Sequence, residues 1–312
     1  MKRFLSWIGM AVFGVGTAFV ILEVALRASG YSEPVFYQPD ERLGWALRPG
    51  ARGIYMDEGR ALVRISAAGM RDRLHPQQKP GGTYRIALLG DGYSEAMQVE
   101  YRDTFGFLLE DRLARCDFRP GMQVEVMNFG VRGYRLPQML EVFEQRARQY
   151  SPDLVLVALS SEAGSPDRPV RVVSLEPPWQ DILWTGADRL RSIQLLHGQY
   201  HRMVKDGGLH ASPAPTLQGG PEVLLPRFKQ AAAEAGAPLV IALIHPQSAV
   251  EAIGKREGIL TIPLAEEMRG REQAGGAPFH GFANATVGRG HWNERGHRAA
   301  ADIIAASLCR QK

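Results

Sequence analysis

The sequence contains little cysteine and no long run of charges of one sign. Its two cysteines, Cys116 and Cys309, are too few for a structural zinc site or a disulfide-rich scaffold. The 37 basic residues exceed the 33 acidic residues by a formal charge of +4, yet five like charges never follow one another. This pattern lacks the basic footprint typical of nucleic-acid binding. We therefore expect no nucleic-acid partner, no metal and no cofactor.

An apolar segment near the N-terminus indicates a membrane anchor. The charge-free residues 5–22 and the few that follow are long enough to cross the ~30 Å hydrocarbon core of a bilayer. Lys2 and Arg3 precede them and predict a cytoplasmic N-terminus with the rest of the chain exported. A cleaved signal peptide is the alternative, but the segment is longer than a usual signal core and no small-x-small cleavage site follows it cleanly. We interpret residues 1–27 as an uncleaved anchor that contacts the membrane through residues 5–26.

Three regions follow the anchor. Residues 28–83 are rich in Pro, Gly and Arg and predict an irregular neck that packs on the main domain, with one short strand at Ala61–Ile65. The main domain, residues 84–312, alternates apolar strands with amphipathic helices, which predicts a parallel sheet covered on both faces. An insert at about 160–220 interrupts this alternation and is a candidate lid or docking surface. We expect strands at 85–90, 124–127, 154–159, 238–244 and 259–262, and helices at 104–116, 136–150, 222–235, 247–257 and 293–308.

Three sequence blocks resemble those of the SGNH (GDSL-type) hydrolases. Residues 86–94 read Ile-Ala-Leu-Leu-Gly-Asp-Gly-Tyr-Ser, similar to the block in which a strand ends in Gly-Asp-Ser. Asn128–Gly130 resembles the second block, whose glycine lines the oxyanion hole, and residues 291–297 resemble the last block, an Asp-x-His before the final helix. With its anchor, the chain is similar to membrane-tethered bacterial members. The resemblance covers roughly residues 37–308 and implies an α/β, flavodoxin-like three-layer parallel sheet. It also implies a single-pass protein of the bacterial cytoplasmic (inner) membrane with its main domain in the periplasm.

The catalytic positions that the resemblance implies are mostly lost. The family's chemistry needs a serine nucleophile, a histidine base oriented by an aspartate, and oxyanion donors. Gly92 stands at the nucleophile position, and Arg289 stands where the aspartate belongs. The third block, which usually carries an asparagine donor, reads Ser-Ser-Glu-Ala-Gly at 160–164. Only Gly130 and His291 match the family's pattern, so the catalytic site is interpreted as degenerate.

Two alternatives would restore a serine nucleophile. Ser94 lies two residues beyond the nucleophile position, although a shift of two residues at a strand-to-helix turn rotates the hydroxyl away. Its structural interpretation is a helix N-cap or first-turn residue. Ser160 or Ser161, at the end of the next strand, could instead face His291, with Glu162 as the orienting carboxylate.

The histidines are interpreted mainly as structural residues. With Arg289 beside it and no obvious carboxylate partner, His291 is expected to be half-buried. Asn293 is predicted to cap the last helix. The remaining histidines of the insert are expected on a solvated helix face rather than in a metal site, because a further ligand and a carboxylate are lacking: His197, His201 and His210.

The two cysteines are predicted to form a disulfide. In the flavodoxin-like sheet that the resemblance implies, the first and last helices lie side by side on one face and run parallel. Cys116 ends the first of these helices and Cys309 ends the last, so both lie at the same end of the sheet. An exported domain permits the bond.

Two functions remain open at this point. The first is a non-catalytic SGNH-like domain used for binding, as an accessory or assembly subunit of a membrane complex or as a helper that binds an envelope glycan. The second is an active esterase or O-acyltransferase on acetyl esters of envelope polysaccharide, with a relocated serine. Gly92→Ser combined with Arg289→Asp is expected to gain more activity than the two single changes added together.

Overall fold

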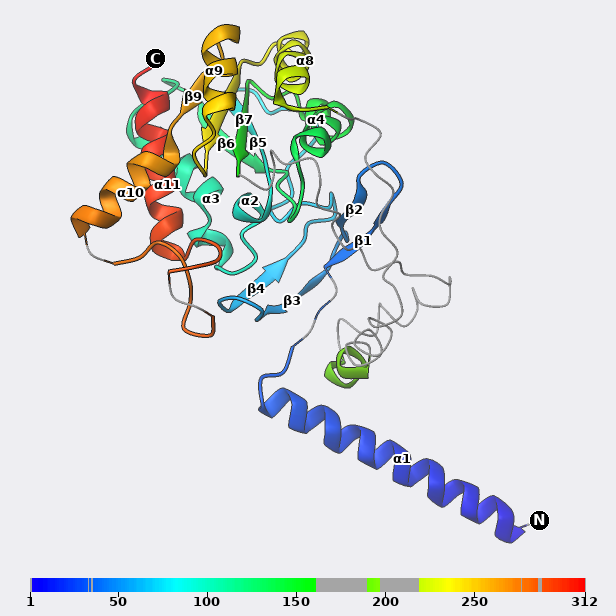
Figure 1. Cartoon of the computed structure of the whole chain (residues 1–312). Coiled ribbons are helices and arrows are strands. Elements are labelled where there is room, and N and C mark those ends of the chain that lie inside the picture. Colours follow the sequence, from blue (N-terminus) through cyan, green and yellow to red (C-terminus); the bar gives the residue numbers. More distant parts are fainter. Residues whose placement is uncertain are drawn as a thin grey trace.

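The computed structural model describes residues 2–32, 34, 36–160, 190–196, 219–275, 277–285 and 288–311. Most of the insert lies outside the described residues, and with it the candidates Ser161 and Glu162 and the three insert histidines. In Figure 1 a long N-terminal helix projects from an α/β domain.

The projecting helix α1, Lys2–Ala28, is the one helix in the described part of the chain that is long and apolar enough to cross a membrane. Its most apolar window has a mean hydropathy of 2.1, and none of that window is buried against the rest of the protein. Glu23 and Arg27 form an i,i+4 ion pair in the last turns of the helix, with 2.7 Å between Oε1 and Nε.

The domain is built on a five-stranded parallel sheet in the order β6-β5-β7-β8-β9. This is the 2-1-3-4-5 order of flavodoxin-like sheets, so the predicted fold class is confirmed. The strands are nearly continuous runs of buried apolar residues because helices cover both faces. Their bounds are β5 (Thr83–Gly90), β6 (Gln123–Asn128), β7 (Leu154–Leu159), β8 (Leu239–Leu243) and β9 (Leu260–Ile262).

Two layers of helices complete the domain (Figure 1). One face is covered by α3 (Phe105–Arg115), α10 (Leu264–Gly275) and α11 (Glu294–Cys309), and the other by α4 (Leu136–Gln145), α8 (Pro221–Glu234) and α9 (Ser248–Glu257). The sequence did not predict α10, which buries only Leu264 and Met268 and so has a weak apolar pattern. The helix expected at 136–150 ends at Gln145 and is followed by a short 3₁₀ turn, Ala147–Tyr150.

The neck is more regular than the sequence suggested. It forms two antiparallel hairpins, β1 (Tyr37–Asp40) with β2 (Gly44–Leu47), and β3 (Arg52–Tyr55) with β4 (Ala61–Arg64). The strand expected at Ala61–Ile65 is present as β4, whose residues alternate between buried and exposed. The rest of the neck was expected to be irregular, and this is wrong because β2 and β3 carry no such alternation. The neck contacts the domain: the Trp45 indole donates to the carbonyl of Arg132 (2.9 Å), and the Tyr134 hydroxyl donates to the carbonyl of Trp45 (2.6 Å).

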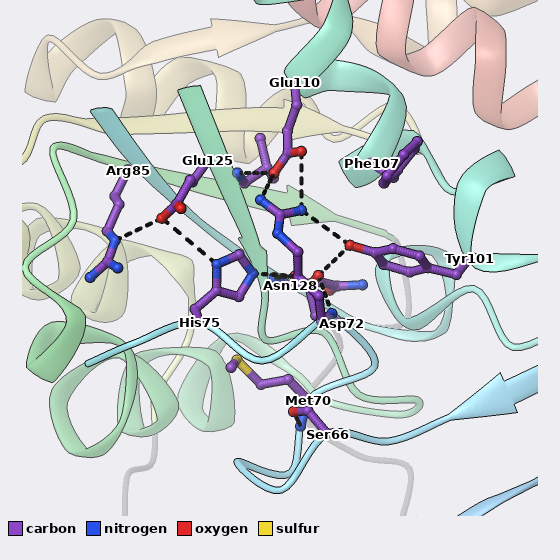
Figure 2. A network of polar contacts seen from close by, with 12 residues as sticks. Ser66, Met70, Asp72, His75, Arg85, Tyr101, Phe107, Glu110, Glu125 and Asn128 are labelled. Atoms are coloured by element: carbon purple, nitrogen blue, oxygen red, sulfur yellow. Dashed lines mark hydrogen bonds and ion pairs between the residues drawn. The ribbon is translucent and has the colours of Figure 1, made fainter. Parts of the chain in front are cut away.

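A polar network fastens the end of the neck to the edge strand β6 (Figure 2). Asp72 accepts a hydrogen bond from the backbone N–H of Asn128 (2.8 Å), and Glu110 accepts one from the N–H of Val126 (2.8 Å). Arg73 bridges to Glu110 through both guanidinium nitrogens, at 2.7 and 3.1 Å. These carboxylates occupy the backbone donors that an edge strand would otherwise offer to another strand.

A second fastening joins α3 to α11, which lie on the same face of the sheet. Cys116, the C-cap of α3, and Cys309, the last residue of α11, form a disulfide with Cα atoms 6.4 Å apart and a sequence separation of 193. Arg112 and Asp302 join the same two helices by an ion pair of 2.7 Å. Asn293 caps α11, as predicted, because its side chain accepts from the N–H groups of Arg295 and Gly296.

Candidate functional site

The loops after β5 and β7 meet at the switch point of the sheet, where ligands bind in open α/β folds. Asp91 follows β5 directly and caps the short helix α2, Gly92–Glu95, by accepting from the N–H of Tyr93 (3.0 Å). Ser160, directly after β7, donates its hydroxyl hydrogen to the other carboxylate oxygen of Asp91. The carboxylate of the first block therefore fixes both loops in place, one through the backbone and one through a serine.

His291 lies directly against Gly92. A Cβ atom built on Gly92 would lie 2.6 Å from Nε2 of His291, closer than non-bonded atoms approach, and 3.6 Å from Cγ of Arg132. The imidazole therefore occupies the space that a side chain at the nucleophile position would need. Glycine at this position is required by the present placement of the histidine.

Glu58 holds His291 from the neck. Its Oε2 lies 2.7 Å from Nδ1 of His291, and its Oε1 accepts from the backbone N–H of His291, also at 2.7 Å. Glu58 lies between β3 and β4, and Asn284 fixes this hairpin tip by bonding to the N–H and the carbonyl of Gly59 at 2.8 and 2.7 Å. A Cβ on Gly290, whose φ is +83°, would lie 2.1 Å from Glu58, so glycine there permits the close approach.

This contact corrects the expectation that His291 lacks a carboxylate partner. Arg289, which the sequence places near it, has an exposed side chain and takes part in no ion pair within the described residues. Glu58 lies 233 residues away in sequence, on a hairpin that was itself unrecognised. No local spacing could have revealed it.

The charge of the pair is set by its hydrogen bonds. Burial alone would raise the pKa of Glu58, but the hydrogen bonds and the charge of His291 outweigh burial and lower that pKa. When the imidazole carries a single proton on Nδ1, that proton faces Glu58, and Nε2 is the acceptor that points to Gly92. This is the tautomer that a general base would have.

Aromatic rings surround the pair. The ring of Tyr93 lies 5.0 Å from the imidazole of His291, 4.9 Å from the indole of Trp292 and 5.6 Å from His245, measured between centroids. The Tyr93 hydroxyl donates to the carbonyl of Gly290 (3.3 Å). Burial lowers the pKa of nearby His280. The region beside His291 is therefore largely aromatic.

The expected oxyanion donor is occupied. The N–H of Gly130 donates to Oδ1 of Asn128 (3.0 Å), and Nδ2 of the same asparagine donates to the carbonyl of Ser94 (2.7 Å). A Cβ on Gly130 would lie 2.4 Å from Cβ of Ser94, so this glycine is needed for packing. Gly130 stands where the resemblance predicts, but its N–H is used inside the protein.

The two candidate serines that lie in the described residues, Ser94 and Ser160, are buried. Ser94 lies in the first turn of α2, is 1% exposed, and fills the space that side chains at Gly90 and Gly130 would need. Ser160 is also 1% exposed and bonds to Asp91. No contact joins either hydroxyl to His291 within the described part of the chain.

The second histidine of the last block is structural. His297 is fully buried, and burial lowers its pKa to about 3, so it stays neutral. Its Nδ1 accepts from the N–H of Phe105 (3.3 Å), which ties α11 to the start of α3. Within the described ranges, no group of three His, Cys, Asp or Glu side chains is arranged to hold a metal ion.

A comparison with solved structures finds hydrolases that are similar to this chain at low sequence identity. A lipase/acylhydrolase from Enterococcus faecalis is 13% identical, with a TM-score of 0.44 over 73% of this chain and 96% of that chain. A GDSL-like lipase from Parabacteroides merdae is 11% identical, with a TM-score of 0.43 over 72% and 95%. A catalytic mutant of an acetylxylan esterase from Geobacillus stearothermophilus is 11% identical, with a TM-score of 0.43 over 74% and 96%.

The five-stranded parallel sheet with helices on both faces is the flavodoxin-like fold that the motifs predicted. No family model matches the sequence. No curated protein matches it either.

Proposed function

We propose that this protein is a membrane-tethered SGNH-like domain that binds a partner or ligand and does not transfer acyl groups through a serine. The position of His291 carries the proposal: its Nε2 fills the place of the nucleophile's side chain, 2.6 Å from where a Cβ of residue 92 would lie. The donor of Gly130 is used by Asn128, which removes a group that would stabilise an oxyanion. The buried hydroxyls of Ser94 and Ser160 further support the proposal.

The proposed location follows from α1 and the charges that flank it. Lys2 and Arg3 favour a cytoplasmic N-terminus, which supports a location in the bacterial inner membrane with the domain in the periplasm. An accessory subunit of a membrane complex, or a protein that holds an envelope glycan, would use such a tethered domain. We expect the full chain, extracted from its native membrane in mild detergent, to co-migrate with a stoichiometric partner or to retain a glycan.

A second candidate function is supported by one observation. Glu58 and His291 form an intact carboxylate–imidazole pair with Nε2 available as a base. An esterase or O-acyltransferase for acetyl esters of envelope polysaccharide, with a relocated serine, would need this pair. Ser161 is the candidate serine that the described residues leave untested.

Ester turnover separates the two functions. We expect the full chain in detergent to hydrolyse an activated acetyl ester no faster than the heat-denatured chain, because no serine among the described residues is paired with His291. The second candidate predicts turnover that falls ~100-fold or more in His291→Ala, since general-base catalysis supplies at least that factor. Its matched control is His245→Ala, which removes another imidazole beside Tyr93 and should leave such turnover largely intact.

A further inference from the structure

The outer face of the β3–β4 hairpin carries three arginines, and we name it the arginine face. Arg52 and Arg64 are direct cross-strand partners, so both side chains project from the same face. Arg60 precedes β4 by one residue and lies on the same side as Leu62, which is 37% exposed. The opposite side of β4 faces the core through Ala61 and Val63.

In the described part of the chain, these arginines have no acidic partner. Within the described residues, none of Arg52, Arg60 and Arg64 takes part in an ion pair, and all three are exposed. Two nearby carboxylates bind other groups: Glu100 accepts a hydrogen bond from the N–H of Leu62 (2.8 Å), and Glu58, at the tip of the hairpin, holds His291. Like charges directly opposite each other destabilise a hairpin. An unpaired Arg–Arg pair therefore suits an external anion.

The arginine face lies at the membrane end of the domain. A Cβ built on Gly30, two residues beyond the end of α1, would lie 3.9 Å from Nη2 of Arg60. The connector then runs along β3, where the hydroxyl of Ser32 accepts from the N–H of Ile54 (3.2 Å) and Pro34 packs against Gly53. The hairpin is thus held next to the point at which α1 ends (Figure 1).

We propose that the arginine face binds the phosphate groups of anionic phospholipids in the membrane that α1 enters, an inference that rests on the membrane-spanning role proposed for α1. Charge complementarity and proximity to the anchor favour this occupant. Exposed Leu62 and Met56 lie among the arginines, and apolar residues beside basic ones suit the headgroup boundary. Docking would hold the hairpin, and Glu58 at its tip, at a fixed orientation to the bilayer.

The test uses the full chain in nanodiscs with a fluorescent label on Leu62→Cys and lipids that carry a quencher on the headgroup. The native cysteines are joined to each other, so the new thiol is labelled alone. In discs containing phosphatidylglycerol we expect headgroup quenching at least about twofold stronger than in phosphatidylcholine discs, and high salt should abolish the difference. A label on Phe13→Cys, quenched from the acyl chains in both kinds of disc, reports insertion of α1 separately.

Charge variants decide the outcome. Arg52→Gln, Arg60→Gln and Arg64→Gln together should abolish the lipid-dependent difference, and the three Arg→Lys changes should restore most of it. The matched control removes three charges from exposed residues elsewhere: Arg148, Lys255 and Arg269. Two results would overturn the proposal that the arginine face binds lipid. One is equal headgroup quenching in phosphatidylglycerol and phosphatidylcholine discs while α1 is inserted. The other is a loss of the lipid-dependent difference in the control variant as large as in the variant of the arginine face. Failure of the Phe13→Cys label to be quenched overturns the anchor on which it rests.

Discussion

Removing the Cys116–Cys309 disulfide lowers the free energy of unfolding by about 5 kcal/mol. The bond closes a loop of 193 residues. In the chain-entropy account, a loop of that length restricts the unfolded state by about this amount. The bond also links the ends of α3 and α11, so its loss frees the C-terminal helix from the one covalent restraint on it.

Urea unfolding of the full chain in detergent measures this loss. Cys309→Ala alone and Cys116→Ala with Cys309→Ala should lose the same stability, because each removes the same cross-link. Reduction of the wild-type protein should reproduce the loss without any substitution. Two free thiols in protein taken from its native compartment would contradict the bond, as would a reduced chain with unchanged stability.

The contribution of Glu95 to the stability of the protein falls between pH 4.5 and pH 7. Burial raises the pKa of this carboxyl to about 7, against the hydrogen bond from the Tyr37 hydroxyl (2.8 Å) and the charges of Arg132 and Arg71. The unfolded carboxyl has its ordinary pKa of 4.5. The folded state therefore binds a proton that the unfolded state has released. Its contribution is complete below pH 4.5 and is lost as the pH rises through 7.

Glu95→Gln should remove this dependence. The free energy of unfolding of the variant relative to wild type should rise by about 3 kcal/mol between pH 4 and pH 8. Glutamine keeps an oxygen that accepts from Tyr37. Arg71 keeps its bond to the backbone carbonyl of Glu95 (3.0 Å), which glutamine leaves in place. The exposed Glu266→Gln on α10 is the matched control and should follow the wild-type profile. A parallel profile for Glu95→Gln would show that the pKa of Glu95 is the same in the folded and unfolded states, and would contradict this account.

The sequence predicts the sheet better than it predicts the site. Five buried apolar strands and the capping residue Asn293 were identified because burial on both faces and helix caps leave strong local patterns. The disulfide followed once the helices were ordered, since Cys116 and Cys309 then end neighbouring helices. These features depend on residues close in sequence or on a topology shared by many chains.

The partner of His291 was missed for a physical reason. In this sequence Arg289 stands at the position where the family has the aspartate that orients the histidine, so the last block contains no carboxylate partner for His291. Glu58 reaches the imidazole from the tip of the β3–β4 hairpin, and the first strand of this hairpin has no alternating pattern that would reveal it. The contact also depends on how the neck folds over the domain. With Glu58 in place, the change Arg289→Asp adds no missing partner, and the expected gain from combining it with Gly92→Ser loses its basis.

Reaction with a fluorophosphonate serine probe, followed by intact-mass analysis of the full chain in detergent, tests the central claim most directly. An active SGNH hydrolase treated in parallel is the positive control. The account predicts an unmodified mass, because His291 fills the nucleophile's place at Gly92 and the hydroxyls of Ser94 and Ser160 are buried. A stoichiometric adduct would contradict it, and the labelled peptide would identify Ser94, Ser160 or Ser161 as the nucleophile.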